Sequence, residues 1–166
     1  FSQTIEDNIG LGSLGHDAVE RAARVARLDD TIRAFPNGYD TMLGERGINL
    51  SGGQQQRTAI ARALAREPGV VILDVALSAV DTETEAAILS NLKDALMGRT
   101  VIVVSHRITA VRDADLILVL DGGKIIERGQ HQDLIAKRGR YWELLRRQQL
   151  EDSLAGATAG SSETPV

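Results

Sequence analysis

The stretch Leu50-Ser51-Gly52-Gly53-Gln54-Gln55-Gln56-Arg57 constrains the fold of this chain more than any other segment. Two glycines stand where a helix should begin, directly after a serine suited to the N-cap, and an apolar face follows at helical spacing: Ala59, Ile60, Ala63 and Leu64. Glycines at a helix start cost backbone entropy, but they let another group approach bare N–H groups at the positive end of the helix dipole. The stretch therefore predicts a phosphate-binding helix start, and Ser-Gly-Gly alone also suits an ordinary helix with a flexible lead-in.

Two apolar runs later in the chain predict neighbouring strands of a parallel sheet. Residues 70–74 form a continuous apolar run that ends in Asp74, which is typical of a parallel strand buried on both faces. Residues 101–104 form the next run, followed by Ser105, His106 and Arg107. Ligands bind at the carboxyl ends of such strands, so Asp74 is a candidate site residue, with the alternative that it simply starts a turn. A single histidine at a strand end, such as His106, is by itself usually just a polar cap.

The remaining segments predict helices, one hairpin and a tail. We expect a short helix over 1–9, and a helix capped by Asp17 that runs to about Phe35 and buries Val19, Ala22, Ala23, Ala26 and Ile32. Gly10 to Gly15 match a dinucleotide fingerprint, but no strand precedes them, so we interpret them as a loop. Further helices are expected over 82–97 and 131–149, and a hairpin over 116–127. From about Glu151 the composition indicates a disordered tail.

The composition narrows the class of protein. The 166 residues, 43% of them hydrophobic, are enough for one domain with a core. A net charge of −4 argues against a general nucleic-acid binder, and the chain has no cysteine for disulfides or thiolate metal sites. No apolar run is long enough to cross a bilayer, and there is no signal peptide pattern.

The string Leu-Ser-Gly-Gly-Gln at 50–54 resembles the signature motif of the ATP-binding cassette (ABC) family. Together with Gly38-Tyr39-Asp40-Thr41 and Gly44-Glu45-Arg46-Gly47, it resembles the exporter branch of that family. The resemblance implies an α/β fold: the C-terminal part of a P-loop NTPase (RecA-like) core with the ABC helical subdomain. It places the helical subdomain at 1–69, the second half of the core at 70–149 and a disordered tail at 150–166.

The resemblance also implies a site for ATP and Mg²⁺ that two nucleotide-binding domains share. Asp74 matches the Walker B aspartate, which holds Mg²⁺ through water, and His106 matches the switch histidine that contacts the γ-phosphate. Glu45 and Arg46 match the stretch that contacts the transmembrane domains. The signature, which closes over the ATP of the partner domain, corresponds to Ser51, Gly52, Gly53 and Gln54, and the D-loop along the dimer seam to Ser78, Ala79, Val80 and Asp81.

One residue departs from the family pattern. The family places a catalytic glutamate directly after the Walker B aspartate, and here that position holds Val75, which can neither accept a proton nor orient water. An intact signature beside this defect predicts the degenerate-site subunit of a heterodimeric exporter. The alternatives are a homodimer inactivated at Val75, a soluble ABC ATPase, and an interaction module without nucleotide chemistry.

The resemblance begins just after the family's Q-loop, so the phosphate loop and the adenine platform are not in these residues. The resemblance implies that the complete transporter acts as an ATP-driven translocase at the cytoplasmic face of the cell membrane. Residues 1–166 alone are expected to be inactive.

Overall fold

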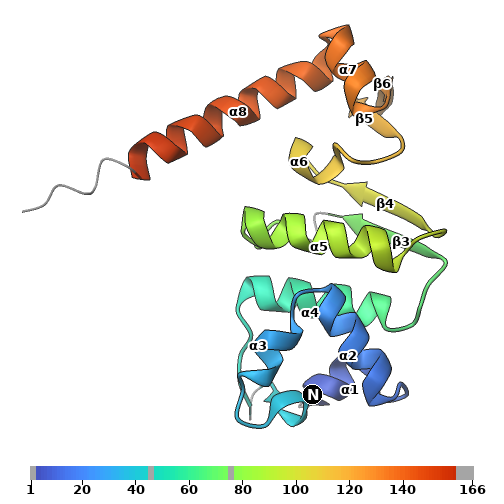
Figure 1. The fold of residues 1–166 in the computed structure, drawn as a ribbon, viewed down its shortest axis with the longest axis vertical. Coiled ribbons are helices and arrows are strands. Elements are labelled where there is room, and N and C mark those ends of the chain that lie inside the picture. Colours follow the sequence, from blue (N-terminus) through green and yellow to red (C-terminus); the bar gives the residue numbers. More distant parts are fainter. Residues whose placement is uncertain (1–2, 45–46, 75–76, 160–166) are drawn as a thin grey trace, which may run out of the picture. The chain divides into compact units, whose positions relative to one another are not determined.

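The computed structural model describes residues 3–44, 47–74 and 77–159, and it gives no side-chain description for Asp152 and residues 155–159. The chain divides into two compact units, Phe1–Val104 and Ser105–Val166. Figure 1 shows their helices and strands in sequence colours. Together they confirm the predicted α/β class.

The first unit begins with a cluster of short helices. Its elements are β1 (Gln3–Thr4), α1 (Ile5–Gly10), α2 (His16–Val25), α3 (Asp29–Arg33), the 3₁₀ helix η1 (Gly38–Asp40), β2 (Met42–Leu43) and α4 (Gly52–Leu64). β1 and β2 pair antiparallel. The core between the helices is formed by apolar residues from all of them, among them Ile5, Ile9, Val19, Leu28, Ile32 and Ile60.

The single helix predicted from Asp17 to Phe35 is wrong, although its five predicted core residues are all buried. The chain leaves the helix after Val25, where Arg27 has a φ of 54°, and starts again as α3. The N-cap is Gly15, which makes no side-chain cap, and Asp17 lies inside the first turn. A left-handed residue ends a helix without needing a glycine or proline in the sequence, which is why the break escaped prediction.

The predicted apolar face of α4 is also partly wrong. Ile60 and Leu64 are buried, but Ala59 and Ala63 are exposed, and their places in the core are taken by Thr58 and Ala61. Thr58 is buried because its hydroxyl donates a 2.8 Å hydrogen bond to the carbonyl of Gln54. A threonine whose hydroxyl donates a hydrogen bond to the carbonyl one turn earlier has its polar group satisfied, so it can pack in the core as an apolar residue does.

The first unit continues with β3 (Val70–Asp74), α5 (Thr82–Ala95) and β4 (Thr100–Val104). β3 and β4 pair parallel, with Asp74 opposite Val104, as predicted. Val71 and Leu73 are buried with α5 residues such as Ile88 and Leu92.

The other face of this strand pair is uncovered, so the prediction of burial on both faces is wrong for this chain. Val70 and Ile72 are 56% and 64% exposed. Their neighbours on the same face of β4, Ile102 and Val104, are 46% and 49% exposed. We call these four residues the open sheet face. Their apolar character is that of a strand buried on both sides, but nothing in the described chain covers them.

The second unit contains α6 (Ile108–Val111), β5 (Ile117–Asp121), β6 (Lys124–Gly129), α7 (His131–Lys137) and α8 (Arg140–Ala159). β5 and β6 form the predicted antiparallel hairpin. A small core holds Ile108, Ile117, Val119, Leu134 and Tyr141. The Tyr141 hydroxyl lies 2.8 Å from Nδ1 of His131.

The C-terminal helical region differs from the prediction in two ways. The single helix expected over 131–149 is divided at Arg138, which has a φ of 51°. The carboxylate of Glu127 accepts the backbone N–H groups of Arg140 and Tyr141, and so begins α8 with a side chain from the hairpin. Beyond Glu151, where the composition indicates disorder, α8 continues to Ala159.

Candidate functional site

The N-terminus of α4 is built by a reciprocal cap between Ser51 and Gln54. Ser51 Oγ accepts the backbone N–H of Gln54 at 3.3 Å, and Gln54 Oε1 accepts the backbone N–H of Ser51 at 2.8 Å. Ser51 has extended backbone angles, and helical geometry starts at Gly52. The predicted N-cap is therefore confirmed, and Gln54 has a structural part in it.

The start of α4 is exposed, and its first turn has no acidic residue to offset the positive end of the helix dipole. Ser51 and Gly52 are exposed, and Gly53 is half-buried. The first turn of α4 contains no acidic residue, whereas α1, α2, α3 and α5 each have at least one there. The first N–H groups of a helix lack an acceptor within the helix. An anion is therefore the group that this helix start can accommodate best.

Two arginines fix α4 to the helices around it. Arg57 contacts the backbone carbonyl of Arg27, at the left-handed end of α2, and also donates to the carbonyl of Gly53 at 3.4 Å. Burial lowers the pKa of Arg57. Arg62 donates to the carbonyl of Asn8 at 2.9 Å. Since both guanidinium groups bind backbone carbonyls, the direction of α4 is set by the helices that precede it.

The turn after β3 packs directly on the start of α4. A Cβ atom added at Gly53 would lie 2.9 Å from the carbonyl oxygen of Ala79, so the glycine permits a backbone-to-backbone contact. Gln56 binds the same turn, through its Nε2 to Ser78 Oγ at 2.9 Å and through its Oε1 to the N–H of Ala79 at 2.9 Å. The signature and the D-loop are separate in the sequence, and the structure brings these two segments together.

Asp81 ends this turn and begins α5. Its Oδ1 accepts the backbone N–H of Thr84 at 2.9 Å. Hydrogen bonds from Thr84, first of all from its backbone, hold the pKa of Asp81 below its ordinary value. The predicted D-loop residue is therefore an ionised N-cap.

Asp74 and His106 each lie exposed beside the end of a strand. Asp74 is the last residue of β3. His106 follows β4, in a loop where Ser105 Oγ accepts the N–H of Arg107 at 3.0 Å. The two residues belong to different units, Asp74 to the first and His106 to the second. Val75, Glu45 and Arg46, named in the sequence analysis, lie outside the described residues.

The acidic groups in the described residues decide how a metal ion could bind. Residues 3–44, 47–74 and 77–159 hold no group of three or more His, Cys, Asp or Glu side chains that could form a metal cage. Mg²⁺ does not need one, because it usually takes one or two carboxylates together with waters and phosphate oxygens of the substrate. The exposed carboxylate of Asp74 fits that kind of binding.

A pocket of about 260 Å³ lies beside the start of α4. Its lining residues include Leu43, Gly44, Ile48, Leu50, Gln55 and Arg62. It therefore lies between α4 and the residues on either side of Glu45 and Arg46.

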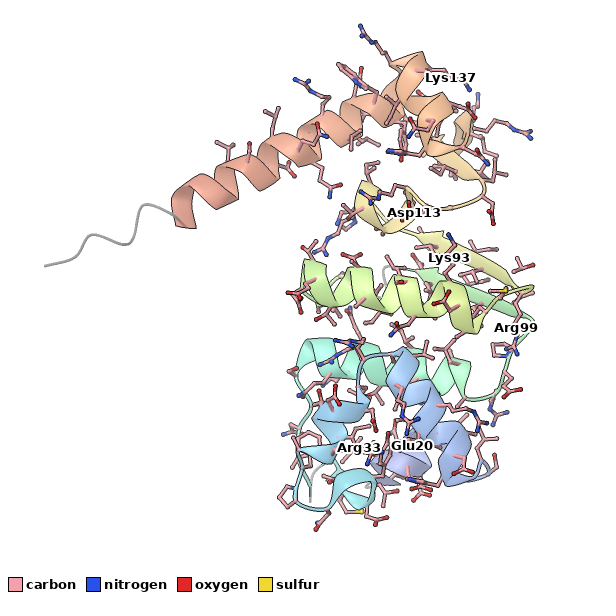
Figure 2. All side chains as sticks on the ribbon, in the orientation of Figure 1. Glu20, Arg33, Lys93, Arg99, Asp113 and Lys137 are labelled. Atoms are coloured by element: carbon pink, nitrogen blue, oxygen red, sulfur yellow. The ribbon has the colours of Figure 1, made fainter. Side chains whose placement is uncertain are left out.

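Sequence reasoning missed a cluster of charged residues that supports this region. Figure 2 labels Glu20 on α2 and Arg33 on α3, which form an ion pair. Arg33 Nε also donates to both carboxylate oxygens of Asp29 at 3.0 Å. Burial, the largest influence, favours the neutral acid, but hydrogen bonds from Tyr39 and Arg33 outweigh it and lower the pKa of Asp29. In the sequence, the tyrosine of Gly38-Tyr39-Asp40-Thr41 is the residue that could have pointed to this charged cluster, because its hydroxyl needs a partner when it is buried.

Comparison with known proteins identifies the protein family of this chain. The family model described as ABC transporter matches residues 2–78. The mitochondrial potassium channel ATP-binding subunit of Xenopus tropicalis is 51% identical over 157 residues, covering 93% of this chain and 23% of the relative. A probable multidrug resistance ABC transporter ATP-binding/permease protein of Bacillus subtilis, YheI, is 48% identical over 164 residues, covering 95% of this chain and 28% of the relative.

A solved structure of a bacterial Atm1-family ABC exporter with ATP bound is similar to this chain at a TM-score of 0.83 and 44% identity, covering 90% of this chain and 27% of that one. The chain therefore belongs to the ABC transporter family. Within the family it is part of the nucleotide-binding domain of the exporter branch. It spans about a quarter of the length of these relatives. None of its described helices is long and apolar enough to cross a membrane.

Proposed function

We propose that this chain is part of the ATP-binding and ATP-hydrolysing half of an exporter, and that it supplies the helix start that closes over the ATP of a partner domain. The observation that carries the proposal is the open, acid-free N-terminus of α4, capped by Ser51. A triphosphate brings the negative charge that this helix end lacks. The exporter relatives support a place at the cytoplasmic face of a membrane, and we propose the cell membrane, although other relatives are mitochondrial by name.

Each residue has a defined part in this proposal. The Ser51 hydroxyl and the N–H groups at Gly52 and Gly53 meet the phosphates held by the partner domain. Asp74 holds Mg²⁺ through water in this chain's own site, where the ion neutralises phosphate charge. His106 contacts the γ-phosphate of that site.

We further propose that the chain's own site is degenerate. Val75 has no group that accepts a proton, and a general base is typically worth about 10²–10⁴ in rate. That corresponds to roughly 3–5 kcal/mol of barrier at ~1.4 kcal/mol per decade. Asp74 still binds metal, so the site holds ATP and turns it over slowly. The intact signature serves a partner that retains its glutamate, and this favours a heterodimer over a homodimer disabled at Val75.

The transmembrane domains contact the chain at Glu45 and Arg46 in this proposal. The pocket beside Gly44 supports it, because the pocket offers a concave surface next to that stretch. Residues 1–166 alone are proposed to be inactive, since Asp74 and His106 cannot hold a nucleotide without a phosphate loop.

The test is ATP hydrolysis by the complete transporter with each substitution made in this chain alone. In a heterodimer, Val75→Glu changes turnover by less than about tenfold, because the partner's glutamate carries the flux. Gly53→Asp cuts turnover severely, since any side chain there meets the Ala79 carbonyl and an acid also repels phosphate.

In a homodimer, Val75→Glu repairs both sites and the gain approaches the ~10²–10⁴ of a general base. A hundredfold gain would therefore end the heterodimer proposal. A Ser51→Ala transporter with undiminished turnover would show that this signature closes no working site.

A further inference from the structure

Gln56 connects the start of α4 to the turn after β3 by both ends of its side-chain amide. Its Nε2 donates to Ser78 Oγ and its Oε1 accepts the N–H of Ala79, each at 2.9 Å. Rotating the amide by half a turn would place its NH₂ group against the Ala79 N–H. The two contacts therefore specify one orientation, and they bind two consecutive residues of the turn.

The turn is held by its two buried flanking residues, by the contact with Gly53 and by the hydrogen bonds of Gln56. Leu77 and Val80, which flank the two bound residues, are 6% exposed each and belong to the core. Gly53 lies three residues before Gln56 on the same side of α4 and touches the Ala79 carbonyl region. Ser78 and Ala79 themselves are exposed, so Gln56 is the side chain that ties the surface of the turn to the helix.

The hydrogen bonds of Gln56 matter for the site because the turn that they hold lies between Asp74 and Asp81 in the chain. Three residues before Leu77 the chain passes through Asp74, and one residue after Val80 it passes through Asp81, which caps α5. The turn is thus part of the chain between the end of β3 and the start of α5. A movement of α4 that Gln56 passes on therefore reaches a turn that begins three residues after Asp74.

We infer that Gln56 is a positioning residue that makes the start of α4 and the Leu77–Val80 turn move as one unit. The inference deepens the proposed function and rests on it: α4 meets the partner's nucleotide, while Asp74 serves this chain's own. Contact of a phosphate with Ser51 and Gly53 then shifts the turn that follows Asp74. Through Gln56, the occupancy of one site sets the geometry of the other.

Three substitutions at or beside Gln56 test the contact in the complete transporter. Gln56→Ala removes both hydrogen bonds. Gln56→Glu keeps them, because a carboxylate accepts both the Ala79 N–H and the rotatable Ser78 hydroxyl. The matched control is Gln55→Ala, since the side chain of Gln55 donates instead to the carbonyl of Leu50 at 3.0 Å.

Hydrogen exchange of the segment 77–81 measures the contact without any catalysis. Gln56→Ala is expected to raise exchange at the Ala79 amide by roughly three- to tenfold, the effect of losing one backbone hydrogen bond. Gln56→Glu and Gln55→Ala should leave it near the wild-type rate. Unchanged exchange in Gln56→Ala would show that Gln56 does not hold the turn, whatever the transporter does with ATP.

Steady-state kinetics measure the positioning. Gln56→Ala should lower kcat by about tenfold or more while changing KM for ATP less than twofold. Without Gln56 the turn no longer positions the start of α4, which in the proposed function closes over the ATP that the partner hydrolyses, and no nucleotide contact is removed. Gln56→Glu should restore kcat.

Loosened exchange with an unchanged kcat would overturn the positioning role, and so would a Gln56→Glu variant as slow as Gln56→Ala with its turn intact. A wild-type transporter without ATP turnover would overturn the proposed function instead. The exchange measurements would then decide separately whether Gln56 holds the turn.

Discussion

The hydroxyl of Tyr39 donates a 2.7 Å hydrogen bond to Oδ1 of Asp29 inside the first unit. Asp29 begins α3, and Tyr39 lies in η1, directly before the chain enters Thr41 and β2. The bond therefore anchors the segment that leads from α3 toward Gly44 and the pocket.

Tyr39→Phe should lower the free energy of unfolding by about 1.5–3 kcal/mol, the range for a hydrogen bond to a charged group, because the buried carboxylate keeps Arg33 but loses the Tyr39 hydroxyl. Denaturant unfolding of the complete nucleotide-binding domain measures it. The matched control is Tyr141→Phe, whose hydroxyl faces a histidine ring, and about 0.5–1.5 kcal/mol is expected there. A loss at Tyr39 no larger than at Tyr141 would mean that the Asp29 charge is not stabilised through Tyr39.

Asp29 should also make the domain sensitive to acid. Its pKa in the folded state is lowered from 3.8, so its stabilising contribution is fully present above that value and is lost as the pH falls through the folded pKa. Asp29→Asn should therefore be less stable than wild type at pH 6, and the gap should shrink below about pH 4. Unfolding curves across this range give the measurement, and Asp30→Asn, at an exposed position, is the control. A gap that stays constant with pH would contradict the assignment.

His16 provides a titration in the opposite direction. Its Nδ1 lies 3.0 Å from a carboxylate oxygen of Glu6, and this hydrogen bond is the main cause of a raised pKa for His16. The stabilisation is fully present below 6.5 and is lost as the pH rises through the folded pKa. Glu6→Gln should return the pKa of His16 toward 6.5, as followed by NMR titration of the ring. Asp17→Asn should lower it less, because Asp17 is the weakest of the carboxylates that raise it.

Ser51 should affect stability and turnover independently. Ser51→Ala is expected to cost about 1 kcal/mol in unfolding free energy through the lost cap, and Ser51→Gly only a few tenths. Both remove the hydroxyl, so both should impair ATP turnover of the complete transporter equally. If turnover instead followed the two stabilities, Ser51 would act only as a cap.

The open sheet face should make residues 1–166 associate when they are prepared alone. Ile72 and Ile102 are 64% and 46% exposed, and exposed apolar patches promote association. Combining Ile72→Gln with Ile102→Gln should increase the monomer fraction in sedimentation experiments. Val71→Gln, on the buried face of the same strand, should unfold the chain instead. A wild-type segment that is monomeric at high concentration would remove the basis for this expectation.

The elements that sequence alone predicted correctly are those whose signals are local. Ser51 caps α4 because a serine followed three residues later by glutamine forms a reciprocal pair, and β3 ends at Asp74 because an apolar run ends there. The breaks at Arg27 and Arg138 were missed, since a left-handed arginine gives no sequence signal of the kind that glycine or proline gives.

Long-range contacts were missed for a different reason. In the sequence, Gln56 is one of three consecutive glutamines. Only its contacts with Ser78 and Ala79, more than 20 residues away, distinguish it from the other two. Likewise, an apolar strand predicts two buried faces, but which neighbouring element covers each face is not encoded in the strand itself.

The reciprocal cap at Ser51 restricts which residues this position tolerates. Serine, asparagine and aspartate are nearly equal as N-caps in ordinary helices. At Ser51 the hydroxyl accepts the Gln54 N–H and still has a hydrogen to donate to an incoming oxygen anion. An ionised aspartate would begin the helix equally well, but it has no hydrogen to give and would place a negative charge where the anion must lie. Among residues that start a helix, only those whose side chain holds both an acceptor and a donor combine the two tasks, and aspartate is not one of them. A change from serine to aspartate, which protein engineering would regard as neutral for folding, therefore becomes a change in what the helix can bind.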